Sequence, residues 1–232
     1  MLESHHDVLA PTLPGHAGGP PLQLPLEEFS LVEGVEAAMD AAGFESAHVV
    51  GNSLGGYVAL QLAARGRALS VVALAPGGGW TVSDAGARDA LERHRLTQEL
   101  VRRAAPHADE IAATPAGRRQ ATQALTVNYE QLPAELVAHL IRGAAAVPAA
   151  DAILDWIAAG GYRPDPERVS CPLRIVWGTE DQVLPWPQAA ARYREQLFPH
   201  AEWIELTGVG HAPQLDVPLQ TAELILGLTG SR

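Results

Sequence analysis

The feature that most constrains this chain is a glycine-flanked serine between a strand-like run and a helical pattern. Residues 51–56 read Gly-Asn-Ser-Leu-Gly-Gly, after an apolar run at 47–50 and at the start of a helical pattern at 54–65. Such a tight turn forces Ser53 into a strained backbone conformation, which we expect the glycines two positions to either side to permit. The turn exposes the hydroxyl at the carboxyl edge of a sheet, where the following helix N-terminus favours negative charge. The pattern predicts Ser53 as a nucleophile; the alternative is an ordinary glycine-rich turn.

The rest of the chain alternates short apolar runs with helical stretches, which predicts an α/β fold with a mostly parallel sheet and helices on both faces. Strands are expected at 7–10, 47–50, 69–75, 173–177 and 202–206, and helices at 27–42, 54–65, 188–197 and 219–228. Residues 84–160 lack strand-like runs and are punctuated by prolines, so four or five short helices are expected there. We predict a core of residues 1–81 and 164–232, with residues 82–163 inserted as a helical cap.

Composition excludes several classes of protein. The chain has 27 acidic and 16 basic residues and a net charge of −11, which argues against nucleic acid and anionic membrane partners. All basic residues are arginines, so a Schiff-base lysine and a P-loop are excluded. A single cysteine cannot form an internal disulfide, and no apolar run is long enough for a membrane span. We expect a soluble, cytoplasmic protein with no metal and no other cofactor, and homo-oligomerisation stays open.

A serine hydroxyl needs a base, and that base needs an orienting carboxylate. Among nine histidines, His211 follows the last expected strand, in a loop whose flanking glycines let the imidazole turn back over the sheet edge. Asp181 lies four residues after the preceding strand, and the adjacent Glu180 is its rival. The order serine, aspartate, histidine is the order expected for this architecture. We therefore expect Ser53, Asp181 and His211 to be catalytic, and no catalytic role for the other eight histidines.

Four segments together resemble the α/β-hydrolase superfamily, specifically its small capped, esterase-like serine hydrolases: residues 8–16, 51–56, 178–185 and 208–218. The resemblance covers the whole chain apart from the cap. It implies Ser53 as nucleophile, His211 as base and Asp181 as acid, with the backbone N–H of Leu54 as one donor of the oxyanion hole. The serine weighs against the haloalkane dehalogenase and epoxide hydrolase branches of the superfamily, which use aspartate at that position.

The front of that family's sheet has no counterpart in this sequence. The resemblance places residues 7–10 at the fourth strand, so strands 1–3 and the loop that carries the second oxyanion donor are missing, and His16 lies one strand too late to replace it. We expect strand 7–10 either to face strand 47–50 across a gap or to pair with it directly. Our hypothesis is a natural start about 30–60 residues upstream. Loss of one oxyanion donor is expected to cost roughly 10²–10³ in turnover.

The expected reaction is hydrolysis of a small, largely apolar carboxylic ester, a small-molecule acyl substrate, through an acyl-enzyme. One triad serves several bond types, so carbon–carbon bond hydrolysis of a vinylogous diketone is the runner-up. The rival from another class is a non-catalytic small-ligand binding protein, or an inactive fragment, on a hydrolase scaffold. Trp80 is the aromatic residue that we most expect to line the substrate pocket.

Overall fold

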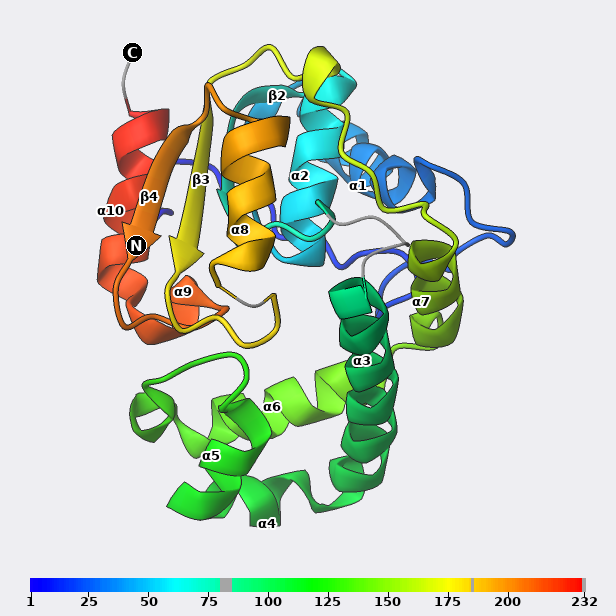
Figure 1. Ribbon diagram of the computed structural model, residues 1–232, viewed down its shortest axis with the longest axis vertical. Coiled ribbons are helices and arrows are strands. Elements are labelled where there is room, and N and C mark those ends of the chain that lie inside the picture. The colour runs from blue at the N-terminus through cyan, green and yellow to red at the C-terminus, as the bar shows by residue number, and fades with distance from the viewer. Residues whose placement is uncertain (80–84, 185, 231–232) are drawn as a thin grey trace.

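The computed structural model describes residues 1–79, 85–184 and 186–230, and its centre is a four-stranded parallel sheet (Figure 1). The strands are β1 (Ala47–Asn52), β2 (Ala68–Leu74), β3 (Leu173–Gly178) and β4 (Glu202–Leu206). They lie side by side in sequence order, and each neighbouring pair is parallel. β2 and β3 are buried along most of their length, as expected for continuous apolar runs covered on both faces.

Helices pack on both faces of this sheet, which confirms the predicted α/β class. Those outside the segment between β2 and β3 are α1 (Ser30–Ala41), α2 (Leu54–Ala64), α8 (Gln188–Arg192), the π-helical turn Tyr193–Leu197, α9 (Pro213–Asp216) and α10 (Pro218–Thr229). Because side chains alternate along a strand, Ile175 packs with Leu60 of α2 on one face. Its neighbour Val176 packs with Ile225 of α10 on the other face.

The described segment between β2 and β3 is helical, as predicted. Its helices are α3 (Ala85–Ala104), α4 (Ala108–Ala113), α5 (Pro115–Thr122), α6 (Ala134–Ala145) and α7 (Ala150–Ala158), with 3-10 turns at Ala105–His107, Tyr129–Gln131 and Pro166–Arg168. In Figure 1, α3 to α6 lie beyond the end of the sheet to which the arrowheads of β3 and β4 point. Ile153 and Ile157 of α7 instead pack with Tyr57 of α2. The domain boundaries predicted from the sequence stay a prediction.

The strand expected at residues 7–10 is wrong. These residues form no strand and are exposed. The chain before them lies near both β1 and α10. The ring of His6 is 5.9 Å from that of His48 on β1, and His6 Nε2 is hydrogen-bonded to Thr229 Oγ1 at the end of α10 at 2.8 Å. Leu2 packs beside the same helix. An extended segment becomes a strand only where a neighbouring backbone pairs with it, and among the described strands β1 pairs with β2 alone, on one of its two edges. Of the two expected arrangements, direct pairing of residues 7–10 with strand 47–50 is therefore wrong, and the gap between them stays a prediction.

None of the helices within residues 1–79, 85–184 and 186–230 combines the length and the apolar character needed to cross a membrane alone. α6 and α7 would reach that length together, but they are bent by 67° with respect to each other.

Candidate active site

Ser53 lies at the junction of β1 and α2 with φ 56° and ψ −117°. A positive φ is unfavourable for a residue with a Cβ atom, and such a conformation persists only where its surroundings hold it. Three backbone hydrogen bonds do so here. The Ser53 N–H donates to the carbonyl of Leu74 (2.9 Å), and the Ser53 carbonyl accepts from the N–H groups of Tyr57 (3.0 Å) and Gly77 (2.9 Å). The strained turn predicted from the sequence is present.

The glycines around Ser53 differ in how much space they leave. A Cβ atom at Gly51 would lie 2.0 Å from the carbonyl oxygen of Gly55, and one at Gly56 would lie 2.9 Å from Cα of Pro76. A Cβ atom at Gly55 would meet nothing within 4 Å. The expected requirement for glycine is therefore correct at Gly51 and wrong at Gly55. The close approach of α2 to the neighbouring loop falls one residue later, at Gly56.

His211 and Asp181 meet beneath the surface, with exposed fractions of only 2% and 4%. His211 Nδ1 lies 2.8 Å from Asp181 Oδ2. The other carboxylate oxygen accepts the N–H groups of Val183 (2.9 Å) and Leu184 (2.8 Å), which fixes the orientation of the carboxylate. Since the carboxylate accepts, Nδ1 carries the proton, and Nε2 of the neutral ring is free to accept one. The rival Glu180 is exposed.

Asn52 joins the serine turn to the histidine loop. Its Nδ2 donates to the carbonyls of Leu74 (3.0 Å) and His211 (2.9 Å), and its Oδ1 accepts from Gln214 Nε2 (3.1 Å). Ser53 and His211 therefore lie on segments that one side chain holds together. Within the described residues no hydrogen bond joins Ser53 Oγ to the His211 ring. The structure thus pairs the predicted base with the predicted acid and brings the serine turn beside them.

Asp216 fixes the histidine loop from the other side. Its buried carboxylate accepts the N–H of Gly210 at 2.6 Å. It also accepts the hydroxyl of Thr126 and the N–H groups of the two residues that follow, at 2.9 and 2.8 Å. The loop after α5 is thereby attached to the residue that precedes His211. Sequence reasoning noted Asp216 only as part of a family-like segment and gave it no role.

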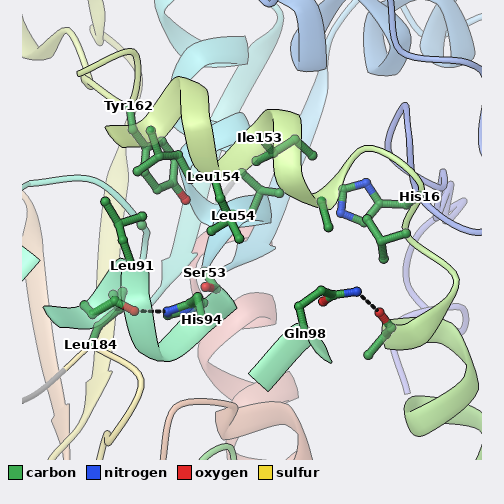
Figure 2. Close-up of a pocket in the computed structure, with 16 residues that line it drawn as sticks. His16, Ser53, Leu54, Leu91, His94, Gln98, Ile153, Leu154, Tyr162 and Leu184 are labelled. Atoms are coloured by element: carbon green, nitrogen blue, oxygen red, sulfur yellow. Dashed lines mark hydrogen bonds between the residues drawn. The ribbon is translucent and has the colours of Figure 1, made fainter. Parts of the chain in front are cut away.

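A cavity of about 270 Å³ opens at Ser53 (Figure 2). Most of its wall is apolar, from α3, α7 and the segments beside them: Leu91, Ile153, Leu154, Ile157, Tyr162 and Leu184. Leu54 also lines it, and its N–H belongs to the first turn of α2, where helical N–H groups have no partner within the helix. Gly77 lines the cavity too, but its N–H is already bonded to the Ser53 carbonyl.

Three polar side chains that sequence reasoning left out of the site line this cavity: His16, His94 and Gln98. His94 and Gln98 lie four residues apart on α3, a helical spacing that is readable from the sequence, but only packing decides which face of the helix looks towards Ser53. His16 comes from the loop after the expected strand 7–10. Its backbone N–H is bonded to the Leu13 carbonyl at 3.1 Å, so His16 contributes its side chain only. Trp80, the expected lining residue, lies outside the described residues.

His94 Nδ1 donates to the carbonyl of Ala90, one helical turn back, at 2.7 Å. Desolvation in the cavity wall lowers the pKa of His94, and the hydrogen bond to Ala90 partly offsets that effect. His94 is nevertheless exposed to solvent as a residue, which limits the shift. His94 therefore offers an uncharged ring nitrogen, Nε2, in the cavity that Ser53 also lines.

Within the described ranges, no group of three or more histidine, cysteine, aspartate or glutamate side chains is arranged to hold a metal ion. The expectation of no metal and no other cofactor stays a prediction.

Comparison with known proteins identifies the family. Residues 2–224 match the profile of the alpha/beta hydrolase family, so the chain belongs to that family and the resemblance to the superfamily is confirmed. The chain is 31% identical over 206 residues to the epoxide hydrolase EphH of Mycobacterium tuberculosis, and the match covers 84% of this chain and 91% of that protein. Family and relative together make the chain a hydrolase.

Solved structures show the same fold. A meta-cleavage product hydrolase matches with a TM-score of 0.70 and 21% identity, covering 100% of this chain and 82% of that one. A thermophilic esterase from Thermogutta terrifontis matches with a TM-score of 0.63 and 20% identity, covering 94% of this chain and 77% of that one.

Proposed function

We propose that this chain is a serine hydrolase that cleaves a small, largely apolar carboxylic ester through an acyl-enzyme. The observation that carries the proposal is the buried hydrogen bond of 2.8 Å between His211 and Asp181, on loops beside the strained turn of Ser53. A histidine whose Nδ1–H is held by a carboxylate presents a basic Nε2, which is the state a serine nucleophile requires. The apolar cavity that Ser53 lines supports a substrate with a largely apolar acyl group.

The reaction follows from these positions. Ser53 Oγ attacks the carbonyl carbon of the ester while its proton passes to His211 Nε2, and the negative charge collects on the carbonyl oxygen. The N–H of Leu54 and the positive end of α2 stabilise that oxyanion. The alcohol then leaves with the proton from His211. Water attacks the acyl-enzyme, His211 takes a proton from it, and the products are a carboxylic acid and the restored Ser53 hydroxyl.

The helices between β2 and β3 would act as the cap of this site. α3 supplies Leu91, His94 and Gln98 to the cavity wall, and α7 supplies Ile153 and Leu154. These side chains line the cavity that Ser53 also lines, so they would shape the acyl pocket and exclude water during attack.

An activated phosphonate tests the proposal without knowledge of the natural substrate. We expect rapid covalent labelling of the wild-type protein, measured by intact mass, and none in Ser53→Ala. Ser70→Ala is the matched control, because Ser70 is a buried serine on β2 whose hydroxyl is hydrogen-bonded to His48, and it should label at the wild-type rate. Absence of labelling in well-folded wild-type protein would instead support a non-catalytic binding protein or an inactive fragment.

Carbon–carbon bond hydrolysis is the second candidate, and the structural match to a meta-cleavage product hydrolase favours it. A panel of p-nitrophenyl esters with acyl chains of increasing length separates the two reactions. We expect turnover with an optimum at a short or medium chain. A protein that is labelled by phosphonate yet hydrolyses no ester of the panel would instead support the carbon–carbon reaction.

Epoxide hydrolysis is a further reaction to consider, because the relative from Mycobacterium tuberculosis is named an epoxide hydrolase. Attack by Ser53 on an epoxide carbon would form an ether, which water does not cleave under these conditions, whereas a carboxylate nucleophile forms a hydrolysable ester. We therefore expect no steady-state formation of diol from styrene oxide. Sustained diol production would overturn the assignment of Ser53 as the nucleophile.

A further inference from the structure

The polar groups of the cavity lie in two places. In Figure 2, Gln98 and His16 lie to the right of Ser53 and His94, and His16 is the farther of the two from Ser53 in this view. The Gln98 side chain and the backbone beside His16 each hydrogen-bond to the segment that runs from the end of α6 to the start of α7. Gln98 Nε2 donates to the carbonyl of Ala144 at 2.8 Å, and the carbonyl of Gly15, beside His16, accepts the N–H of Ala149 at 3.3 Å. The apolar cavity thus has a second polar position away from the reacting serine.

The hydrogen bonds of these two side chains determine what each still offers. His16 Nδ1 is 3.1 Å from the carbonyl oxygen of Pro14 and must therefore carry a proton, which leaves Nε2 of the neutral ring as an acceptor. Gln98 uses one N–H on Ala144 and keeps its Oε1 and its second N–H. In the part of the chain that the structure describes, His16 Nε2 and Gln98 Oε1 have no hydrogen-bond partner.

We propose that the cavity selects an acyl group with an apolar body and a hydroxyl at its far end, bound by His16 and Gln98. This inference rests on the proposed ester hydrolysis. A hydroxyl can donate to one of the two acceptors and accept the remaining N–H of Gln98. None of the described residues that line the cavity is an aspartate, glutamate or arginine, so a terminal carboxylate or ammonium would meet no acidic or arginine side chain of opposite charge there.

The test compares methyl esters matched in chain length, with acid release followed by titration at constant pH. The series carries a terminal methyl, a terminal hydroxyl, a terminal carboxylate or a 2-hydroxyl group. With two neutral hydrogen bonds of about 0.5–1.5 kcal/mol each, we expect kcat/KM for the terminal hydroxyl to exceed that for the methyl about tenfold at the best length. A preference for the carboxylate, or for the 2-hydroxyl next to the reacting carbonyl and His94, would overturn the proposal.

Variants locate the effect. His16→Phe and Gln98→Met keep the side-chain bulk but remove the acceptors, and each should reduce the tenfold preference to about threefold or less while the terminal-methyl ester is still hydrolysed. Arg95→Met is the matched control, because Arg95 lies on the same helix and pairs with Asp155 of α7 at 2.7 Å but does not line the cavity. It should keep the full preference.

The two proposals fail in different ways. If the wild-type protein is labelled by phosphonate and hydrolyses the esters with equal efficiency, only the hydroxyl proposal is overturned. If neither labelling nor hydrolysis of any ester occurs, the proposed function fails, and the hydroxyl proposal fails with it.

Discussion

The carboxylate of Asp216 accepts the N–H of Gly210 at 2.6 Å, one residue before His211, and the same carboxylate holds the loop after α5. Asp216 is 4% exposed, so these hydrogen bonds to a carboxylate are shielded from competing water. The position of His211 therefore depends on a contact that joins the histidine loop to the helical segment between β2 and β3.

Asp216→Asn replaces one acceptor oxygen with an NH₂ group that must face N–H donors. We expect the free energy of unfolding to fall by about 1–3 kcal/mol, measured by urea denaturation. The rate of phosphonate labelling should fall about tenfold or more, because the histidine loop loses its fixed position. The control is Asp151→Asn, whose exposed carboxylate pairs with Arg102 at 3.3 Å, and it should change stability by less than about 0.5 kcal/mol. Equal effects of the two substitutions would contradict the role of Asp216.

Asp181 and Glu180 are neighbours with different surroundings, because Asp181 is buried against His211 and Glu180 is exposed. Asp181→Asn keeps the shape of the buried side chain but can no longer stabilise a positively charged His211 ring. We expect the rate of phosphonate labelling to fall roughly 10³–10⁴-fold at pH 7.5. Glu180→Gln removes an exposed carboxylate one residue away and should leave the rate within about twofold. A larger loss in Glu180→Gln than in Asp181→Asn would reverse the assignment of the acid.

Local signals explain which parts could be predicted from the sequence. Four of the five expected strands are present. They could be predicted because apolar runs and their turns are properties of short segments, and the turn at Ser53 likewise follows from adjacent residues. The strand at 7–10 failed because a strand depends on a partner that no local pattern supplies. The cavity positions of His16 and Gln98, and the buried contacts of Asp216, arise from packing between distant segments. The sequence therefore predicted the turn at Ser53 better than it predicted the wall of the cavity.

Gly51 and Gly55 provide a matched pair of substitutions beside Ser53. Gly51→Ala would place a Cβ atom 2.0 Å from a backbone carbonyl oxygen, and we expect it to lower the free energy of unfolding by about 1–3 kcal/mol. Gly55→Ala meets open space within α2, so the better helix propensity of alanine should leave stability unchanged or raise it by up to about 1 kcal/mol. Urea denaturation of both variants measures the difference, and equal destabilisation would contradict this account of the turn.

The buried tyrosines should make the protein sensitive to alkali. Burial raises the pKa of Tyr57 to about 12, and it also raises the pKa values of Tyr162 and Tyr193 above the usual 10.0. Below pH 10 these tyrosines are neutral in both states. Above pH 10 they ionise in the unfolded chain first, so each should remove about 1.4 kcal/mol of stability per pH unit until it ionises in the folded state.

The chain has no lysine to titrate in this window, and Cys171→Ala removes its single thiol. Urea denaturation from pH 9 to 12 in that background should show this loss, with a smaller slope in Tyr57→Phe; a flat profile, or an unchanged slope, would refute the prediction.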